Sequence, residues 1–299
     1  MFTFRRIRRA VTKTSVRVPV VWARHHRLNQ PDAFIASYPR SGSTWLRFLL
    51  LEVLSGESSG FRKVDKLIPD VGKHRKTPPM LPDGGRVIKT HEAFRPEYKK
   101  AVYLARDARD VVLSEYAYQT ALGLVSCNFD DYLLRFLRGK VNGYGSWQAH
   151  VISWLDASLD ESRDIRVVKF EDLRRNGLGT IGQILDFFGV RVDPKVIERA
   201  IANNSIQQMR EKERVTPQRA SKRGRFIRNG LTGAWRERLT GAQVRVIQQY
   251  AGSALSRLGY LGGNALADRG NQGVPPAAGS LGAETGMKKT KVDDRSWQS

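Results

Sequence analysis

The stretch at 37–45 combines hydroxyl side chains, a glycine and an arginine between two apolar segments, and it reads SYPRSGSTW. A turn from a strand into a helix binds phosphate, because the first N–H groups of a helix are unpaired and lie at the positive end of its dipole. Gly42 lets the backbone approach an anion closely, and Arg40 adds a fixed, forked positive charge. The sequence therefore predicts a phosphate-binding loop. Three hydroxyl side chains add donors: Ser41, Ser43 and Thr44.

This loop differs from the Walker A pattern G-x-x-x-x-G-K-[ST] at two positions. Gly42 and Thr44 match its last glycine and its Ser/Thr, but Ser37 replaces the first glycine and Ser43 replaces the lysine. Because that lysine normally reaches the terminal phosphates, the loop is not an ordinary ATP or GTP loop. A P-loop kinase or NTPase remains an alternative function, and an ordinary strand–turn–helix with a serine cap is the structural alternative.

Two more segments carry anion-binding groups. In 103–116, a strand delivers Arg106 to the start of a helix, and Ser114 lies two turns further on, so both side chains can contact one anion only if it lies along that helix. Local ion pairs at the helix start are the alternative. The segment 226–235 reads FIRNGLTGAW and combines a basic residue with a glycine turn, for which a basic surface turn is the alternative.

His91 is the candidate general base. It closes the sequence Val87-Ile88-Lys89-Thr90-His91, directly after an expected strand, and strand ends line the ligand crevice of a parallel sheet. Histidine has a pKa near working pH, as a base that accepts a proton from a hydroxyl requires. Lys89 and Arg40 supply positive charge for the leaving group. A lone histidine is otherwise more often structural.

These segments together resemble the sulfotransferase family that uses 3′-phosphoadenosine 5′-phosphosulfate (PAPS), in its cytosolic-type, bacterial-like form. Residues 38–45 are similar to the family's 5′-phosphosulfate loop, Y-P-K-S-G-T-T-W, with Arg40 replacing the lysine. The family's K-T-H motif is matched in full. The family pattern R-K-G-x-x-G-D-W is matched at 228–235, except at Asn229 and Ala234. The resemblance covers roughly 33–260, with the motifs in family order.

The resemblance implies in-line sulfuryl transfer from PAPS to a hydroxyl or amine, with PAPS as co-substrate and no metal. It implies an α/β fold of the P-loop-NTPase-like sulfotransferase type, with a central parallel sheet flanked by helices. The implied catalytic residues are His91, Lys89 and Arg40. The implied cofactor-binding residues are Arg40, Ser41, Gly42, Ser43, Thr44, Trp45, Arg106, Ser114, Phe170, Arg228, Asn229 and Gly230, among which Trp45 and Phe170 are expected against the adenine.

Composition limits the remaining functions. The chain has 299 residues, a net charge of +22 and one cysteine, which excludes an intrachain disulfide and a cysteine-based zinc site. The positive charge favours anionic partners, so a basic nucleic-acid-binding module is an alternative. No helix-turn-helix, zinc-finger or RNA-binding signature supports it, and we expect no nucleic-acid partner.

Charge and composition divide the chain into three parts. Residues 1–31 hold eight Lys/Arg and no acid, and we expect them to form a basic arm, either solvated or bound to an acidic membrane surface. Residues 32–261 are expected to form the sulfotransferase domain. Residues 262–299, rich in Gly, Ala and Pro, are expected to be a disordered tail. With no secretory signal or membrane span in the sequence, we expect a cytoplasmic protein, with membrane-surface attachment as the alternative.

Short apolar runs alternate with helical patterns between these ends. Strands are expected at 34–38, 86–89, 101–104 and 165–169, and helices at 45–54, 107–119, 178–188 and 244–258. This alternation favours a parallel sheet covered on both faces. The stretch at 56–85 is expected to form a loop beside the nucleotide. The acceptor pocket is expected in this loop and in the aromatic stretch at 117–150, which leaves a small molecule, a lipid or a glycan as acceptor.

Overall fold

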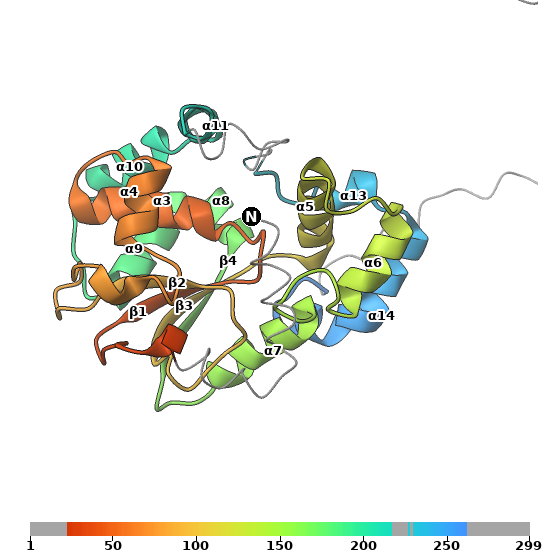
Figure 1. The fold of residues 1–299 in the computed structure, drawn as a ribbon, viewed down its shortest axis with the longest axis horizontal. Coiled ribbons are helices and arrows are strands. Elements are labelled where there is room, and N and C mark those ends of the chain that lie inside the picture. Colours follow the sequence, from red (N-terminus) through yellow and green to blue (C-terminus); the bar gives the residue numbers. More distant parts are fainter. Residues whose placement is uncertain (1–22, 217–226, 228–229, 262–299) are drawn as a thin grey trace, which may run out of the picture. The chain divides into compact units, whose positions relative to one another are not determined.

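Four short parallel strands form the centre of the domain (Figure 1). The computed structural model describes residues 23–216, 227 and 230–261, so most of the basic arm and the whole C-terminal tail lie outside the described residues. The sheet has the order β2-β1-β3-β4 and confirms the expected parallel arrangement. Its strands are β1 (Ala33–Ala36), β2 (Val87–Thr90), β3 (Lys100–Ala105) and β4 (Asp164–Lys169).

Helices cover both faces of the sheet, and alternate residues of β1 enter two different cores. Ala33 and Ile35 pack into one core, whereas Phe34 and Ala36 pack into the other. Because both of its faces are buried, the central strand β1 is continuously apolar, whereas the edge strand β4 alternates and is mostly half-buried or exposed. The first core also contains residues of α3 (Ser43–Ser55), α4 (Phe61–Leu67), α9 (Gly177–Phe187) and α10 (Pro194–Asn203). The second contains residues of α5 (Ala108–Ala121), α6 (Phe129–Leu137), α7 (Trp147–Ala157) and α14 (Gly241–Arg257).

The expected strands and helices are all present, with shifts of a few residues at their ends. The start of α5 is fixed by Asp107, whose side chain accepts a hydrogen bond from the backbone N–H of Arg109 at 2.9 Å. The stretch at 56–85 was expected as a loop, but it contains α4 and the short helix η1 (His74–Lys76). Both are a few residues long, and buried residues such as Phe61 and His74 anchor them to the domain. The remaining elements are α8 (Phe170–Arg175), α11 (Ile206–Arg214) and α13 (Trp235–Arg238).

A buried ion pair joins the beginnings of β1 and β2. The Nε of Arg86 donates to Oδ1 of Asp32 at 2.9 Å and its Nη2 donates to Oδ2 at 2.5 Å. Asp32 is 1% exposed, and burial alone would raise its pKa, but the hydrogen bonds and charge of Arg86 leave the pKa lowered. Arg86 also donates to the carbonyls of Arg27 and His74. One guanidinium therefore ties the described end of the basic arm and η1 to the sheet.

We expect Asp32→Ala to lower the free energy of unfolding by about 3–5 kcal/mol, because it leaves the Arg86 guanidinium buried without its counterion. Urea unfolding followed by circular dichroism measures the change. Glu161→Ala removes an exposed carboxylate and is expected to stay within about 0.5 kcal/mol of the wild type. Equal unfolding midpoints for the two variants would contradict the assigned role of the pair.

Candidate active site

A cavity of about 560 Å³ opens at the carboxyl-terminal edge of the sheet, and the segments that follow three different strands contribute to it. The loop at 37–42 follows β1, His91 follows β2, and Arg106 follows β3. Residues of α3, α5, α8, α11 and the segments 142–144 and 230–238 also line it. Ligands bind at this edge in open α/β sheets, and the volume is in the range of small-molecule sites.

The predicted phosphate loop has the backbone geometry of an anion site. Arg40 and Gly42 both lie in the left-handed region, with φ of 70° and 98°. A Cβ at position 42 would lie 2.4 Å from the Phe170 ring, so only glycine fits between the loop and α8. The N-cap residue of α3 is Gly42, which has no side chain to cap the helix, and the first turn of α3 holds no acidic residue. Since Ser43 and Thr44 line the cavity, the open end of α3 meets it.

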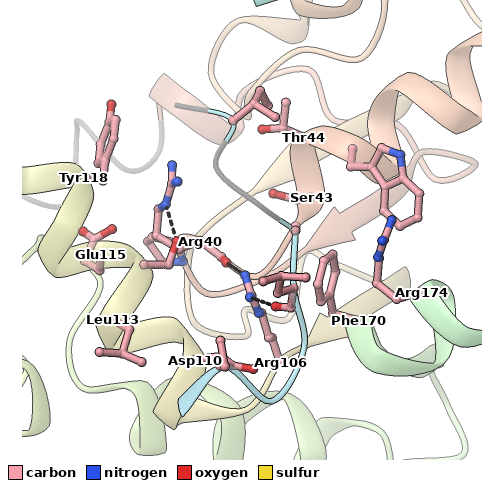
Figure 2. A pocket seen from close by; sticks show the side chains of 18 of the residues that line it. Arg40, Ser43, Thr44, Arg106, Asp110, Leu113, Glu115, Tyr118, Phe170 and Arg174 are labelled. Atoms are coloured by element: carbon pink, nitrogen blue, oxygen red, sulfur yellow. Dashed lines mark hydrogen bonds between the residues drawn. The ribbon is translucent and has the colours of Figure 1, made fainter. Parts of the chain in front are cut away.

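Two arginines converge on this loop (Figure 2). The Nε of Arg40 donates to Oγ of Ser114 at 3.2 Å, and its guanidinium lies 4.5 Å from the centre of the Tyr118 ring. The Nη1 of Arg106 donates to the carbonyl of Arg40 at 3.0 Å. Burial lowers the pKa of Arg106, and nearby carboxylates partly offset that effect. Both guanidinium groups therefore line one cavity, and the hydrogen bond from Arg40 to Ser114 joins the loop to α5.

Aromatic rings line the cavity beside the start of α3. The rings of Trp45 and Phe170 lie 6.2 Å apart in an edge-to-face arrangement, and both residues line the cavity. The indole N–H of Trp45 donates to the carbonyl of Asn204 at 2.8 Å, which fixes the ring. The guanidinium groups of Arg106 and Arg174 lie over Phe170 and Trp45, at 4.6 and 5.2 Å. Such a wall provides flat apolar surfaces for a planar ring such as a purine.

Asp110 holds the glycine-containing segment that closes the cavity. Its two oxygens accept hydrogen bonds from the backbone N–H groups of Gly233 at 2.6 Å and Trp235 at 3.1 Å. Burial raises the pKa of Asp110, an effect that the nearby Arg106 partly offsets. The Arg109 guanidinium lies 3.7 Å from the centre of the Trp235 ring. Gly230 lines the cavity, while the predicted cofactor residues Arg228 and Asn229 lie outside the described residues.

His91 has one ring nitrogen fixed and one open. Its Nδ1 lies 2.7 Å from the carbonyl oxygen of Ser37. Because a carbonyl only accepts, Nδ1 carries the proton and Nε2 keeps its lone pair. The ring lines the cavity and lies edge-on to Tyr144, with centres 5.6 Å apart. Burial, and then the positive charge of Lys89, lowers the pKa of His91 well below 6.5. The ring is therefore a neutral base at pH 7.

Lys89 and Ser41 differ from the other candidate residues, since neither is among the described residues that line the cavity. Lys89 is buried, and its Nζ donates to Oδ1 of Asp70 at 2.7 Å. The hydroxyl of Ser41 is also buried, and the part of the chain that the structure describes offers it no hydrogen-bond partner. Lys89 therefore acts on the site through its charge, by lowering the pKa of His91. The remaining described candidates line the cavity together: Arg40, Gly42, Ser43, Thr44, Trp45, His91, Arg106, Ser114, Phe170 and Gly230.

Sequence reasoning did not assign seven polar residues of the cavity: Asp110, Glu115, Asn142, Arg174, Asn204, Glu237 and Arg238. Only Glu115 had a local signal, since an acid directly follows Ser114 in a helix that is buried over most of its first two turns. The others reach the cavity through contacts between distant segments. No group of three His, Cys, Asp or Glu within residues 23–216, 227 and 230–261 could hold a metal ion. Likewise, none of the described helices is long and apolar enough to cross a membrane.

The fold and cavity define an α/β protein with an anion-binding loop and a histidine on one cavity, and comparisons with known proteins give its family. Residues 30–259 match the family model described as "Sulfotransferase domain". The chain therefore belongs to the sulfotransferase family and is a sulfotransferase. Sulfotransferase 2A6 of Rattus norvegicus is 28% identical over 248 residues, which are 74% of this chain and 84% of that protein.

Two solved structures share the fold. Mouse sulfotransferase SULT7A1 complexed with PAP has a TM-score of 0.60 and 21% identity, covering 76% of this chain and 86% of that one. Retinol dehydratase in a complex with retinol and PAP has a TM-score of 0.63 and 20% identity, covering 80% of this chain and 86% of that one. The expected sulfotransferase fold is thereby confirmed.

Replacing Asp110 by Asn is expected to weaken the binding of PAP, the desulfated donor. Asn offers one acceptor oxygen where Asp110 offers two, so the N–H of Gly233 or Trp235 loses its partner and the glycine segment loosens. A buried unsatisfied donor costs about 1–3 kcal/mol, which corresponds to roughly a 5- to 150-fold rise in Kd if the segment binds the nucleotide. Isothermal titration calorimetry with PAP measures the Kd of the wild type and of the variant. An unchanged Kd would show that the segment does not contribute to nucleotide binding.

The imidazole of His91 is expected to remain neutral at pH 6.5 in the ligand-free protein, because its pKa is lowered well below 6.5. The uncharged ring therefore persists to a lower pH than in an exposed histidine. Lys89→Met removes a positive charge, which disfavours the imidazolium, and is expected to raise the pKa of His91. Nitrogen-15 NMR titration of the ring measures both. A ring half-protonated at pH 6.5 in the wild type, or no change on substitution, would contradict this assignment.

Proposed function

We propose that this sulfotransferase transfers a sulfuryl group from PAPS to a hydroxyl or amine of a small-molecule acceptor, with His91 as the general base. The observation that supports it most is that His91 and the open N-terminus of α3 line the same cavity. His91 presents an unprotonated Nε2, and the helix end presents unpaired N–H groups beside Arg40. A base and an anion site on one cavity are what transfer from a phosphosulfate to a neutral nucleophile requires.

The donor is expected to lie along the loop, α5 and the aromatic wall. Its phosphosulfate would meet Arg40 and the N–H groups at the start of α3, and the buried hydroxyl of Ser41 is proposed as a further donor. Its 3′-phosphate would meet Arg106 and Ser114. Gly230 and its neighbours Arg228 and Asn229 are proposed to complete that site. The adenine would lie against Trp45 and Phe170, whose rings form the flat apolar part of the lining.

In the transfer, the acceptor oxygen attacks sulfur while the bond from sulfur to the 5′-phosphate oxygen breaks. The acceptor proton passes to Nε2 of His91, and the carbonyl of Ser37 stabilises the resulting imidazolium by accepting from Nδ1–H. The bonding electrons leave with the 5′-phosphate oxygen of PAP. Arg40 stabilises this negative charge but does not supply a proton, since a guanidinium stays protonated. Lys89 keeps His91 unprotonated before the attack.

The acceptor class is part of the proposal. The solved complexes of retinol dehydratase contain retinol or androsterone, both small molecules with a hydroxyl group. We propose a small molecule with a hydroxyl group as acceptor for this chain too, because its cavity has a suitable size and a partly apolar lining. A lipid or glycan acceptor would need the cavity to continue onto the surface. A cytoplasmic location, with the basic arm at 1–31 on an acidic membrane surface, remains a proposal.

Thermal unfolding with PAP tests the donor site, with 5′-AMP, ATP and a short oligonucleotide as controls. At 100 times its Kd a ligand adds about 2.7 kcal/mol to the free energy of unfolding. We expect PAP to stabilise the protein more than 5′-AMP, because only PAP carries the 3′-phosphate for Arg106 and Ser114. Stabilisation by ATP or the oligonucleotide alone would instead favour a P-loop kinase or NTPase, or a nucleic-acid-binding module.

His91→Gln is expected to lower kcat for sulfate transfer from PAPS by roughly 10²–10⁴-fold, because a general base contributes about that factor. Stabilisation by PAP should persist, since the substitution leaves Arg40, Arg106 and Ser114 in place. His26→Gln removes an exposed imidazole and serves as the matched control. Equal kcat in His91→Gln and the control would exclude His91 as the base.

A further inference from the structure

We propose that Glu115 makes the enzyme select acceptors that carry a positive charge, such as a hydroxyl compound with an ammonium group. The proposal rests on the function above and specifies its acceptor. Glu115 lines the cavity from α5, one residue after Ser114, and is 5% exposed. Figure 2 shows Glu115 and Tyr118 projecting from α5 on the side of Arg40. A buried carboxylate that lines a ligand cavity is uncommon unless a cation meets it.

The protein gives this carboxylate little compensation. Its Oε1 accepts a hydrogen bond from Nε2 of Gln119 at 2.6 Å. Across residues 23–216, 227 and 230–261, no ion pair includes Glu115; Arg40, the nearest candidate in the cavity, bonds instead to Ser114 and stacks on Tyr118. A buried charge without a counterion is costly, so a bound cation would stabilise the carboxylate and be stabilised by it.

Glu115 lies at the end of the cavity that holds the base. Gln119, its hydrogen-bond partner, also donates to the carbonyl of Val141 at 3.3 Å. The next residue, Asn142, lines the cavity and donates to the Tyr38 hydroxyl at 3.1 Å. This segment continues to Tyr144, whose ring packs against His91. We call this part the acceptor end; its lining residues are His91, Glu115, Tyr118, Asn142 and Tyr144.

The negative charge of Glu115 also acts on side chains beside the acceptor end. Burial raises the pKa of Tyr38, and the negative charge of Glu115 raises it further. The Tyr38 hydroxyl donates to the carbonyl of Gly145, so this charge is felt beside the segment that carries Asn142 and Tyr144. The donor's own negative charges are matched by Arg40 and Arg106 at the loop. A cationic group on the acceptor therefore has its complement at Glu115, the acidic residue of the acceptor end.

Aromatic rings at the acceptor end strengthen this selection. Tyr118 and Tyr144 both line the cavity, and a ring face attracts a cation as well as packing against an aromatic acceptor. One face of Tyr118 already holds the Arg40 guanidinium at 4.5 Å, so Tyr144 is the ring that an acceptor cation would meet. An acceptor with a hydroxyl at His91 and an ammonium at Glu115 would satisfy both polar groups at once.

Two phenols of similar size test the proposal: tyramine, which carries an ammonium group, and 4-ethylphenol, which does not. The kcat/KM of each is measured with PAPS for the wild type, Glu115→Gln and Glu161→Gln. Glu161 is an exposed acid on the turn before β4, so its substitution removes the same charge from the molecule but not from the cavity. Thermal unfolding of the PAP-bound protein with each phenol compares the binding of the two phenols without the chemical step.

A charge-assisted hydrogen bond is worth roughly 10- to 100-fold in binding, so tyramine should be preferred by about that factor in the wild type and in Glu161→Gln. In Glu115→Gln, the kcat/KM for tyramine should fall to about that for 4-ethylphenol, while the kcat/KM for 4-ethylphenol changes little. If Glu115 only balanced Arg40, its substitution would alter both phenols and PAP together and leave the ratio unchanged, which would overturn the proposal.

The two proposals fail in different ways. No preference for tyramine in the wild type, or no effect of tyramine on either rate or stability, would overturn the selection of cations while PAP stabilisation left the sulfotransferase site intact. Loss of PAP stabilisation together with no transfer from PAPS would overturn the donor site, and with it the acceptor proposal that depends on it.

Discussion

Parallel pairing of β1 with both of its neighbours is the constraint on which the site depends. The register sets Ala36 opposite Thr90 on one side and opposite Tyr103 on the other. The three strands therefore end at one edge, and the chain continues from each end into a functional segment. The phosphate loop, His91 and Arg106 are far apart in the sequence, yet this register brings them to one cavity. A slip by one residue would turn the side chains of a strand to the opposite face and displace the segment that follows.

Two kinds of positively charged side chain lie around the cavity. Lys89 and Arg109 are buried and paired with Asp70 and Asp107, so their charges are matched within the protein. Arg40 and Arg106 instead bond to a hydroxyl and to carbonyl groups, which accept hydrogen bonds without cancelling charge. Both guanidinium groups line the cavity, where an anionic donor would meet their positive charge.

Local sequence was sufficient for the strands and the functional loops, because each has a pattern that a few residues define. Short β-branched runs gave the sheet, and the loop at 37–45 and His91 were found from residue type and position. The pairing of Lys89 with Asp70 was not found, because the bridging side chain approaches from a separate segment. The contact of Asp110 with Gly233 was missed for the same reason, since it joins residues 123 positions apart. Contacts of that kind depend on how the helices pack, which short patterns do not specify.

Helix α5 serves both halves of the cavity. Its start carries Asp110, which holds the glycine segment, and its middle carries Ser114 and Glu115 as adjacent residues, one toward Arg40 and the other at the acceptor end. A rigid helix moves as one body, so occupation of either half biases the position of the other. Because thermodynamic linkage is reciprocal, the factor by which bound nucleotide changes the acceptor's affinity equals the factor by which acceptor changes the nucleotide's affinity. Any coupling between the two ligands would therefore pass through the one helix that lines both halves of the cavity.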